Sequence, residues 1–488
     1  MNNRAHRAAG HDQLTTKANT IATKIVCTIG PASDSPRVLT QLIQAGMDVA
    51  RINFSHGTYD QHVRSIRTIR QVSQRLHRPI AILQDLPGPK LRVGKLATEP
   101  LHLQRLDKIS LTTKPTSAKS KIPIAYPDLP KAVKKGDMVF LADGTIRIEV
   151  LRTRRDEVEG RVINGGDLTS GKGVNLPRLR IRVPAITGDD REHIKFGVEN
   201  KVDIIAVSFV QKVDDIRAAR KVAEANGHQI FVVAKIEKRE AVDNLEGIVQ
   251  EADGIMVARG DLGVELKLEL VPIIQKRIIH ESNRLGKPVI TATQMLESMV
   301  SSLTPTRAEV TDVANAIIDG TDAVMLSEET AIGKYPVEAV RILGRVAEET
   351  ERFLPKEISP QRRAWYEHGQ ADALALGACE TALQVSALAI VAPTRTGRTA
   401  RLVSKYRPPL PIIALTSHLE VQRQLLLSWR VQTLLTKEFN TSEEIFREAE
   451  RTVVKMRLAR KGDRVVIIAG DPKGPSGKTE ILKVQTIS

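Results

Sequence analysis

Short apolar runs alternate with longer amphipathic segments along most of the chain. The first three runs are TKIVCTIG, GMDVARINF and RPIAILQD, and segments with helical periodicity separate them. Apolar runs of this length, bounded by turn residues, predict buried strands of a parallel sheet, with crossover helices between them. Ser33 or Asp34 is expected to cap the first helix, and Asp189 or Asp190 to begin a later one.

Residues 87–184 interrupt this rhythm. They are rich in Thr, Lys and Arg, and their apolar and polar residues alternate between Gly and Asp turns such as ADGT. Alternation of this kind predicts a small β domain with hairpins. The strand–helix rhythm then resumes and reaches an eighth strand at DAVMLS, which is the count of a (β/α)8 barrel.

The predicted fold is therefore α/β: a (β/α)8 TIM barrel with an inserted small β-barrel lid domain and a C-terminal α/β domain. The barrel would comprise residues 21–86 and 185–350, the lid 87–184, and the C-terminal domain 351–488. Residues 1–20 would form a short arm. A length of 488 residues agrees with several domains.

The composition indicates a protein of the cytoplasm. No apolar run approaches the roughly 20 residues that a membrane helix needs, and no secretory signal is evident at the start. The two cysteines, Cys27 and Cys379, are too few for a disulfide framework or a zinc site, and their apolar surroundings favour a place in the core. We expect no membrane partner.

The net charge of +16 requires an explanation, and it is concentrated in the insert. Residues 87–184 hold 20 Lys and Arg against 10 Asp and Glu. A nucleic-acid surface, a site for phosphorylated small molecules and a solvated basic face are the three interpretations. Aromatic residues make up only 3% of the chain, which leaves few groups to stack on bases, so nucleic acid ranks last.

Polar side chains follow the predicted barrel strands, at the carboxyl ends where such barrels place their chemistry. Glu237 and Asp261 are hard oxygen donors of the kind that Mg²⁺ takes, with water and substrate in its other positions. Lys235 and Arg51 supply positive charge for a phosphate or an enolate. The ARGDLG turn adds backbone N–H groups for an anion, whereas unrelated surface ion pairs are the alternative. The full set is Arg51, Asn53, Asp85, Ser208, Lys235, Glu237, Asp261, Thr293, Ser327 and Glu328.

Several common site motifs are absent. The chain has no Ser-His-Asp order, no zinc motif and no dinucleotide fingerprint after its first strand. GDPKGPSGKT at 470–479 is close to a nucleotide P-loop, but Pro472 stands where the motif needs glycine and a strand is predicted after it. We reject the P-loop and keep the segment as a candidate phosphate-holding turn.

Long motifs in order give the chain a close resemblance to the pyruvate kinase family. They are TKIVCTIGPAS at 23–33, GMDVARINFSHG at 46–57, AKIE at 234–237, DGIMVARGDLGVE at 253–265, KPVITATQMLESM at 287–299 and PTRAEVTDVANAIIDGTDAVMLS at 305–327. The resemblance implies transfer of a phosphoryl group from phosphoenolpyruvate to ADP, giving pyruvate and ATP. It also implies a homotetramer.

The resemblance implies a role for each site residue. Glu237 and Asp261 would hold Mg²⁺, for which Mn²⁺ could substitute. Lys235 would stabilise the phosphoryl group in transfer, and Arg51 would bind the phosphate. The remaining implied roles are the substrate carboxylate for Thr293, Gly260 and Asp261, the nucleotide for Asn53, Arg92 and Lys172, and the proton relay to enolpyruvate for Ser327. The insert would close on the nucleotide and exclude water.

The chain departs from the family pattern near the third strand. Members that need K⁺ usually read D-T-K-G-P-E there, with the ion bound by Asn, Ser, Asp and Thr groups. This chain keeps Asn53, Ser55 and Asp85, but has Leu86 and Lys90 in place of Thr and Glu. We therefore predict that K⁺ is not required, because the Lys90 ammonium would replace its charge. Glu328 stands where the family commonly has glycine; an outer salt bridge is the one role that we suggest for it.

A loop in the last domain resembles the effector loop of allosteric family members. It contains Thr394, Thr396, Gly397, Arg398 and Thr399 between a predicted strand and helix, with Gly474, Gly477 and Lys478 expected to face it. This predicts activation by a sugar phosphate or a nucleotide, and a plain helix cap is the alternative. For the whole chain, the alternatives are another phosphoenolpyruvate-using barrel, a basic nucleic-acid-binding protein and a family member without activity.

Overall fold

Eight parallel strands close into a barrel in the order β1-β16-β15-β14-β13-β12-β3-β2. The computed structural model describes residues 21–89, 91–118, 120–142, 144–176, 184–365, 369–474 and 478–488. Almost every strand residue is buried, which explains why these runs are uniformly apolar rather than alternating. The strands are β1 (Lys24–Thr28), β2 (Val49–Asn53), β3 (Ala81–Asp85), β12 (Ile204–Val207), β13 (Phe231–Ile236), β14 (Gly254–Ala258), β15 (Val289–Ala292) and β16 (Ala323–Leu326).

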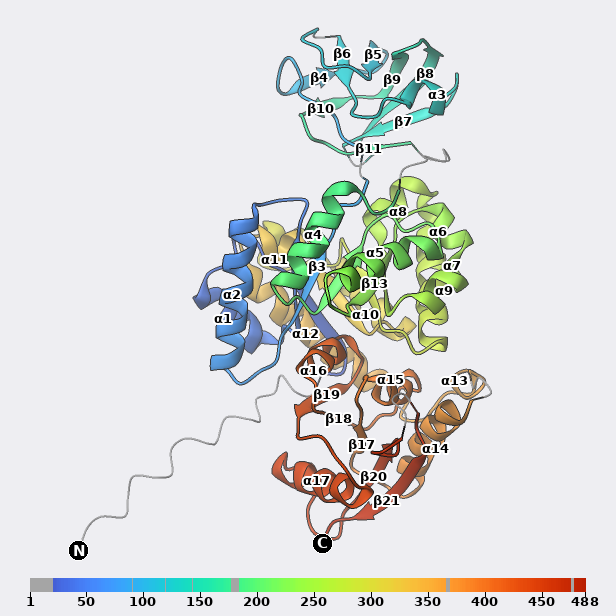
Figure 1. Cartoon of the computed structure of the whole chain (residues 1–488). Helices are drawn as coiled ribbons and strands as arrows, with labels where there is room; N and C mark the ends of the chain where they lie inside the picture. The colour runs from blue at the N-terminus through green and yellow to red at the C-terminus, as the bar shows by residue number, and fades with distance from the viewer. Residues whose placement is uncertain are drawn as a thin grey trace, which may run out of the picture.

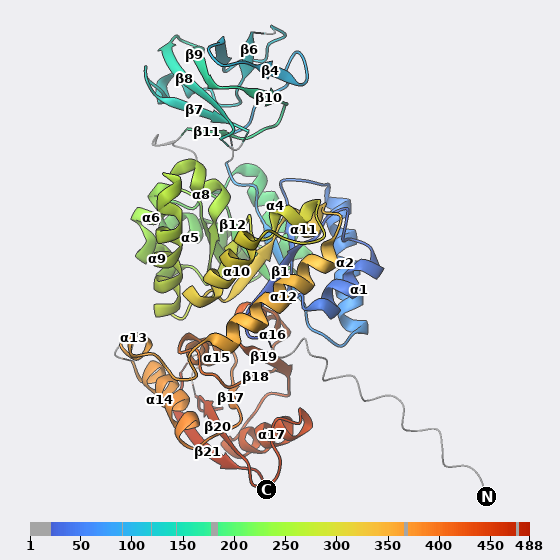
Figure 2. The same ribbon diagram turned by 180° about the vertical axis from the view of Figure 1, so that it is seen from behind.

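Helices surround the barrel on all sides (Figures 1 and 2). Their apolar stripes pack on the strands and form the largest hydrophobic core of the molecule. The helices are α1 (Pro36–Ala45), α2 (Tyr59–Arg75), α4 (Gly188–Glu199), α5 (Val213–Ala225), α6 (Arg239–Asp243), α7 (Leu245–Glu251), α8 (Arg259–Glu265), α9 (Val271–Arg284), α10 (Arg307–Asp319), α11 (Glu328–Ala331) and α12 (Pro336–Phe353), with short 3-10 turns η2 (Leu268–Leu270) and η3 (Glu297–Val300).

Two predicted helix starts were wrong. The cap of α1 is Ser35, whose hydroxyl accepts from the N–H of Val38, because Pro36 suits the first helical turn; the Ser33 hydroxyl instead accepts from Gly30 N in the preceding turn. The cap of α4 is Thr187, in a capping box with Asp190. In both cases the hydroxyl of a nearby residue, Ser35 or Thr187, accepts a hydrogen bond from a backbone N–H of the first helical turn.

The insert forms a six-stranded sheet, in the order β11-β7-β8-β9-β5-β6, and a two-stranded sheet of β10 and β4. It has its own hydrophobic core. Because it leaves the barrel directly after β3, it lies beyond the carboxyl ends of the barrel strands (Figure 1). Its elements are β4 (Leu101–Leu103), β5 (Lys108–Thr112), β6 (Lys121–Pro123), α3 (Leu129–Ala132), β7 (Met138–Leu141), β8 (Ile146–Thr153), β9 (Glu157–Asn164), β10 (Gly166–Leu168) and β11 (Val174–Asn175).

The last domain is a five-stranded sheet, in the order β19-β18-β17-β20-β21, with only β21 antiparallel. Separate hydrophobic cores cover its two faces. Because β21 follows the 470–479 segment, the structure also lacks the helix that a P-loop requires there. The elements are α13 (Pro360–Arg363), α14 (Gln370–Gln384), β17 (Ile390–Pro393), α15 (Arg398–Lys405), β18 (Ile412–Thr416), α16 (Leu419–Gln424), η4 (Leu425–Leu427), β19 (Val431–Leu435), α17 (Ser442–Lys455), β20 (Arg464–Ala469) and β21 (Ile481–Thr486).

This domain docks on the amino end of the barrel, opposite the insert (Figures 1 and 2). Lys24 Nζ, at the start of β1, donates to Val431 O at 2.8 Å, and Arg430 N donates to Ala22 O at 2.8 Å. The carboxyl ends of the barrel strands are therefore left facing the insert.

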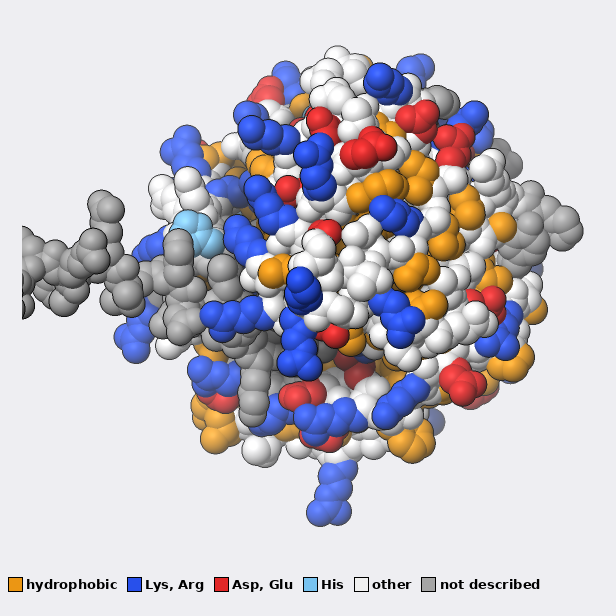
Figure 3. Space-filling model, turned by 90° about the horizontal axis from the view of Figure 1, so that it is seen from below, with side chains coloured by type: hydrophobic (Ala, Val, Ile, Leu, Met, Phe, Trp, Pro, Cys, Tyr) orange, Lys and Arg blue, Asp and Glu red, His pale blue; other side chains and the backbone are white. Residues whose placement is uncertain are grey.

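Three expectations about composition can be compared with the structure. Cys27 and Cys379 are buried free thiols, which agrees with a place in the core. Within the described ranges, no helix is long and apolar enough to cross a membrane. Lys and Arg side chains are spread over the face seen from below, with fewer acidic ones between them (Figure 3), so the basic character extends beyond the insert.

Candidate active site

Four charged side chains from three strands meet at the carboxyl end of the barrel. Asp85, which ends β3, lies between two cations: its Oδ2 accepts from Arg51 Nε at 2.7 Å and its Oδ1 accepts from Lys235 Nζ at 3.0 Å. Lys235 Nζ also lies 3.0 Å from Glu237 Oε1 and donates to Ser208 Oγ at 2.7 Å. Five of the ten residues that the sequence predicted at the strand ends are thus joined in one network: Arg51, Asp85, Ser208, Lys235 and Glu237.

Burial makes the charges of this network depend on one another. Burial alone would lower the pKa of Lys235, but the carboxylates of Asp85 and Glu237 outweigh it and raise that pKa. Burial also raises the pKa of Glu237, opposed by Lys235 and reinforced by the negative charge of Asp261. Lys235 is therefore firmly cationic, whereas Glu237 is a carboxylate that gains from additional positive charge nearby.

The backbone is strained where it supplies groups to the mouth. Phe209 and Thr293 have positive φ angles of 56° and 67°, which non-glycine residues rarely adopt. In this conformation Phe209 N donates to Glu237 Oε2 at 2.7 Å, and Thr293 Oγ1 accepts from Gly260 N at 2.9 Å. The ARGD turn at the start of α8 is thereby joined to the residue that follows β15.

Arg259, a charged residue at the end of a predicted strand, is a structural brace, although the sequence pattern assigned it no role of its own. Its Nη2 donates to Thr293 O at 2.6 Å, and its Nη1 pairs with Asp312 at 2.6 Å. It is 9% exposed. The sequence shows that Arg259 belongs to the ARGDLG motif. Only the structure shows that its side chain is buried and bonds to Thr293 and Asp312.

Ser327 lies at the end of β16, beside a buried carboxylate. Its N–H donates to Glu329 Oε2 at 2.6 Å, and Glu329 Oε1 accepts from Leu296 N at 3.1 Å. Burial raises the pKa of Glu329. The Ser327 hydroxyl is buried and has no hydrogen-bond partner among the described residues.

Glu328, by contrast, points to solvent. It is exposed, and no cationic group in the described part of the chain lies within ion-pair distance of its carboxylate. The suggested outer salt bridge is therefore not seen. Glu329, one residue further on, carries the structural role, and only tertiary contacts distinguish the two.

Thr28 is a second residue that sequence reasoning missed. Its Oγ1 accepts from Arg51 Nη1 at 2.8 Å and donates to Leu326 O at 2.9 Å. The hydroxyl fixes the Arg51 guanidinium against the closing strand of the barrel. A threonine inside an apolar strand was the one available signal.

The metal prediction rests on a pair of carboxylates. Glu237 and Asp261 interact electrostatically, and both would offer hard oxygen atoms. Within the described ranges no group of three or more His, Cys, Asp or Glu side chains is placed to hold a metal. The pair fits an ion such as Mg²⁺ that takes few protein ligands and keeps water and substrate oxygens.

The predicted monovalent-cation region offers few free oxygens. Leu86 is 2% exposed and contributes an apolar side chain, while both Asp85 oxygens are already paired with cations. Asn53 Oδ1 accepts from Ser55 N at 3.1 Å. Lys90 lies outside the described residues.

The two predicted nucleotide residues of the insert lie on facing segments. Arg92 Nη1 donates to Gly171 O at 3.0 Å, and Val93 N donates to Lys172 O at 2.9 Å. No hydrogen bond within the described ranges joins either side chain to Asn53 or the rest of the mouth. The insert reaches the barrel through Asn175, whose Nδ2 donates to Glu265 Oε1 on α8 at 3.4 Å.

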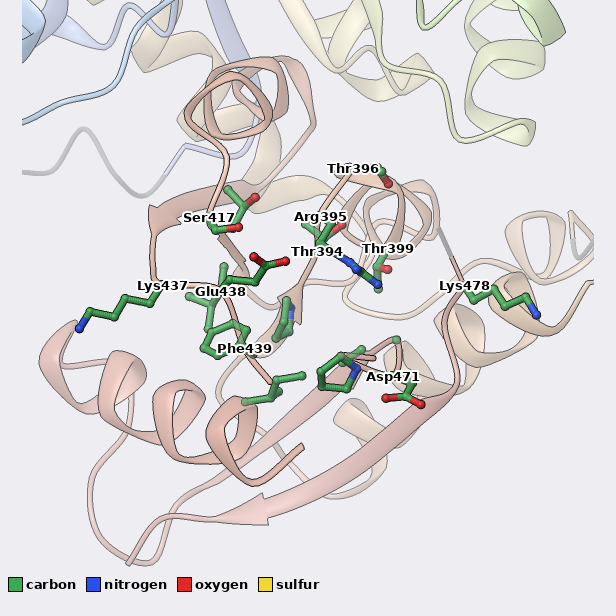
Figure 4. Close-up of a pocket in the computed structure, with 17 residues that line it drawn as sticks. Thr394, Arg395, Thr396, Thr399, Ser417, Lys437, Glu438, Phe439, Asp471 and Lys478 are labelled. Atoms are coloured by element: carbon green, nitrogen blue, oxygen red, sulfur yellow. The ribbon is translucent and has the colours of Figure 1, made fainter. Parts of the chain in front are cut away.

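The loop after β17 in the last domain, which begins at Thr394, lines one side of a pocket (Figure 4). Thr394 Oγ1 accepts from Gly397 N at 2.9 Å, and Gly397 has a φ of 80°, which shapes the turn before α15. Arg395 Nη2 donates to Gly474 O at 2.6 Å, so Gly474 lies against this loop. Lys478 lines the pocket, although its side chain extends away from the centre in Figure 4. Thr396 and Thr399 also line it, Arg398 begins α15, and Gly477 lies outside the described residues.

Comparison with known proteins gives consistent matches across the chain. The family model "Pyruvate kinase, barrel domain" matches residues 20–340, and "Pyruvate kinase, alpha/beta domain" matches residues 372–485. Pyruvate kinase 2 of Synechocystis sp. is 46% identical over 470 residues, covering 95% of this chain and 79% of that protein. Pyruvate kinase of Thermococcus litoralis is 44% identical, covering 95% of this chain and 98% of that one. The crystal structure of a pyruvate kinase from Cryptosporidium parvum superposes with a TM-score of 0.90 at 37% identity, covering 96% of this chain and 97% of the other.

Proposed function

The chain belongs to the pyruvate kinase family and is an enzyme that acts on phosphoenolpyruvate and ADP, and we propose how its own residues carry out that reaction. The observation that carries the proposal is the network at the barrel mouth, where Lys235 is held cationic between Asp85 and Glu237. Phosphoryl transfer depends mainly on positioning and on neutralising charge, and this network supplies both.

Each residue at the mouth has a proposed task. Arg51, oriented by Asp85 and Thr28, binds the phosphate. Lys235 donates to the phosphoryl oxygens and to the developing enolate. Thr293 and the Gly260 N–H hold the substrate carboxylate at the turn where they already meet. The Ser327 hydroxyl, buried and without a partner among the described residues, joins the proton relay to the enolate carbon.

Glu237 and Asp261 are the proposed ligands of Mg²⁺, or of Mn²⁺ in its place. When bound, the ion supplies positive charge to the oxygens of phosphoenolpyruvate. The fit rests on donor chemistry and on the repulsion between the buried carboxylate of Glu237 and the half-buried one of Asp261, which the ion would relieve. Asn53, Arg92 and Lys172 are the proposed nucleotide contacts, with the insert closing over the mouth.

The enzyme is expected to work without K⁺. Leu86 offers no oxygen, and Asp85 is already neutralised by Arg51 and Lys235, so a K⁺ ion would find few ligands and no uncompensated charge on Asp85. Pyruvate release that depends on ADP should proceed at the same rate in Na⁺, K⁺ and tetramethylammonium buffers. A large stimulation by K⁺ would contradict this proposal, and absence of ADP-dependent pyruvate release in every buffer would contradict the function itself.

A double variant tests whether Leu86 and Lys90 are the reason that K⁺ is not required. The double substitution Leu86→Thr with Lys90→Glu restores the Thr and Glu of K⁺-requiring members at these two positions. It is expected to lose activity in tetramethylammonium and to regain it in K⁺. If the double variant responds to no monovalent cation while the parent enzyme is active, the two residues do not determine the requirement.

We also propose that the pocket around the loop after β17 binds an activating sugar phosphate or nucleotide. Arg395 and the threonine side chains that line it suit a phosphoryl group. Such an effector should lower the phosphoenolpyruvate concentration that gives half-maximal rate, and Arg395→Met should remove that response. Saturation curves measured with a panel of sugar phosphates and nucleotides check this, and the absence of a shift with all of them would overturn it.

The oligomeric assembly and the cellular location are proposed from the family, and one structural observation supports the assembly. Leu268 in η2 and Ile273 at the start of α9 are 74% and 63% exposed, which suits a contact with a second copy of the chain. We propose a homotetramer in the cytoplasm. Mass measured by light scattering tests the assembly.

A further inference from the structure

A second cavity lies between the barrel and the last domain, away from the barrel mouth and next to the pocket of Figure 4, with which it shares Thr396. Its volume is about 640 Å³, within the range of small-molecule sites. The barrel side is the turn between α9 and β15, and the other side is formed by α15 and the start of α14. Added to Gly286 in that turn, a Cβ would lie 3.6 Å from Leu402 Cδ2, so the turn and α15 are close neighbours.

The lining of this interdomain cavity is strongly cationic. It contains five basic side chains against the carboxylates of Asp253 and Asp372. Asp372 is engaged by Lys405 at 2.9 Å, and Asp253 by Arg220 at 3.1 Å. The basic residues are Arg284, Lys287, Arg398, Arg401 and Lys405.

Lys287 of the barrel and Arg401 of the last domain both line this cavity without a carboxylate of their own. Lys287 Nζ donates to the carbonyls of Ala252 and Gln250, at 2.6 and 3.0 Å, and Arg401 Nη2 donates to Thr396 O at 3.0 Å. Among the described residues, no carboxylate lies within ion-pair distance of either. Arg401 Nη1 is buried and has no hydrogen-bond partner there, which is costly for a charged donor.

The electrostatic balance agrees with a missing anion. Burial lowers the pKa of Lys287 and of Arg401, Asp253 opposes the change at both, and Arg401 itself lowers the pKa of Lys287. An anion bound between Lys287 and Arg401 would offset the repulsion between these two cations. It could also accept a hydrogen bond from Arg401 Nη1.

We propose that the interdomain cavity is a second ligand site, which binds a small phosphomonoester between Lys287 of the barrel and Arg401 of the last domain. Gln370 and Thr396, which also line the cavity, can bond hydroxyl groups of such a ligand. No aromatic side chain occurs among its described lining residues, so the cavity suits a phosphorylated polyol better than a nucleotide base.

The position of the cavity couples the ligand to both other sites. Lys287 is two residues before β15, whose opposite end carries Thr293 at the barrel mouth. Arg401 lies on α15, and Thr396 lines both this cavity and the pocket of Figure 4. A phosphomonoester here would tie the two domains together, whether or not the loop after β17 binds an effector of its own.

Direct binding to the full-length protein tests the proposal. The probe is glycerol 3-phosphate, measured by isothermal titration calorimetry, with glycerol as the uncharged counterpart. Arg395→Met provides a background in which the pocket of Figure 4 is disabled. In that background one site per chain should remain, and addition of Lys287→Gln should weaken it at least about tenfold, since a hydrogen bond to a charged group is lost.

Two controls separate the outcomes. Lys195→Gln makes the same change of charge on the exposed face of α4 and should leave the binding unaltered. Thermal unfolding of each variant reports folding, and glycerol 3-phosphate should raise the midpoint of the parent protein but not that of Lys287→Gln. Absence of binding in the Arg395→Met background, or equal affinity with and without Lys287, would overturn the proposal.

Discussion

Lys235→Met is expected to lower kcat by about 10³-fold while phosphoenolpyruvate still binds. Methionine matches the length of the lysine side chain but removes the charge that meets the phosphoryl group. Removal of one preorganised group of this kind costs about 10²–10³-fold in kcat, and removal of a cationic group from a phosphoryl-transfer site about 10³–10⁵-fold. Steady-state kinetics of pyruvate release measures the effect, and full activity of the variant would remove Lys235 from the mechanism.

The same substitution also changes stability, which needs its own control. Without Lys235, the carboxylates of Asp85 and Glu237 remain buried with less compensation, and breaking a buried pair costs about 3–5 kcal/mol. Lys24→Met is the matched variant: Lys24 is also buried, but at the amino end of the barrel. It should lower the unfolding midpoint without lowering kcat. Loss of activity in both variants to the same degree would indicate a folding effect.

Glu237→Gln is expected to have the second largest effect, on the requirement for the divalent cation. The amide keeps the shape of the side chain, and its oxygen can still accept from Phe209 N, but the charge of one proposed ligand is lost. The Mg²⁺ concentration for half-maximal rate should rise by at least about 10- to 100-fold, the range already observed when outer-shell partners of metals are removed. Rates measured against Mg²⁺ concentration at saturating substrates check this.

Glu351→Gln is the matched control for Glu237. Its carboxylate also accepts from two backbone N–H groups, those of Ala22 and Thr23, but at the opposite end of the barrel. The Mg²⁺ dependence of this variant should equal that of the parent enzyme. An unchanged Mg²⁺ dependence in Glu237→Gln would exclude Glu237 as a ligand.

The two expectations share one physical cause, the position of Lys235 between two carboxylates with different tasks. Asp85 is fully paired with Arg51 and Lys235, so it orients cations and leaves little for a monovalent ion. Glu237 has one cation partner and the charge of Asp261 opposing it, so it remains the group that gains from a metal. At the barrel mouth, the neighbouring charges thus give the two carboxylates different tasks: Asp85 positions cations, and Glu237 is the proposed metal ligand.

The pattern of the sequence determined the architecture, because each barrel strand is an apolar run that needs burial on both faces. The polar residue that ends each run must then lie at the mouth of a parallel barrel, whatever the details of packing. This is why Arg51, Asp85, Lys235, Glu237, Asp261 and Thr293 were predicted together. Their adjacency follows from strand order and direction.

Tertiary structure alone decided which atoms meet. Thr28 and Leu326 are 298 positions apart, and their hydrogen bond exists because β1 closes the barrel against β16. Glu329 rather than Glu328 is the buried carboxylate, since only one of two neighbours on α11 can face the end of β15. Lys287 and Arg401 form a site because the docking of two separately folded domains brings them together. No local pattern encodes such distances: they depend on how whole elements pack, whereas the strands and their ends depend on the nearest few residues.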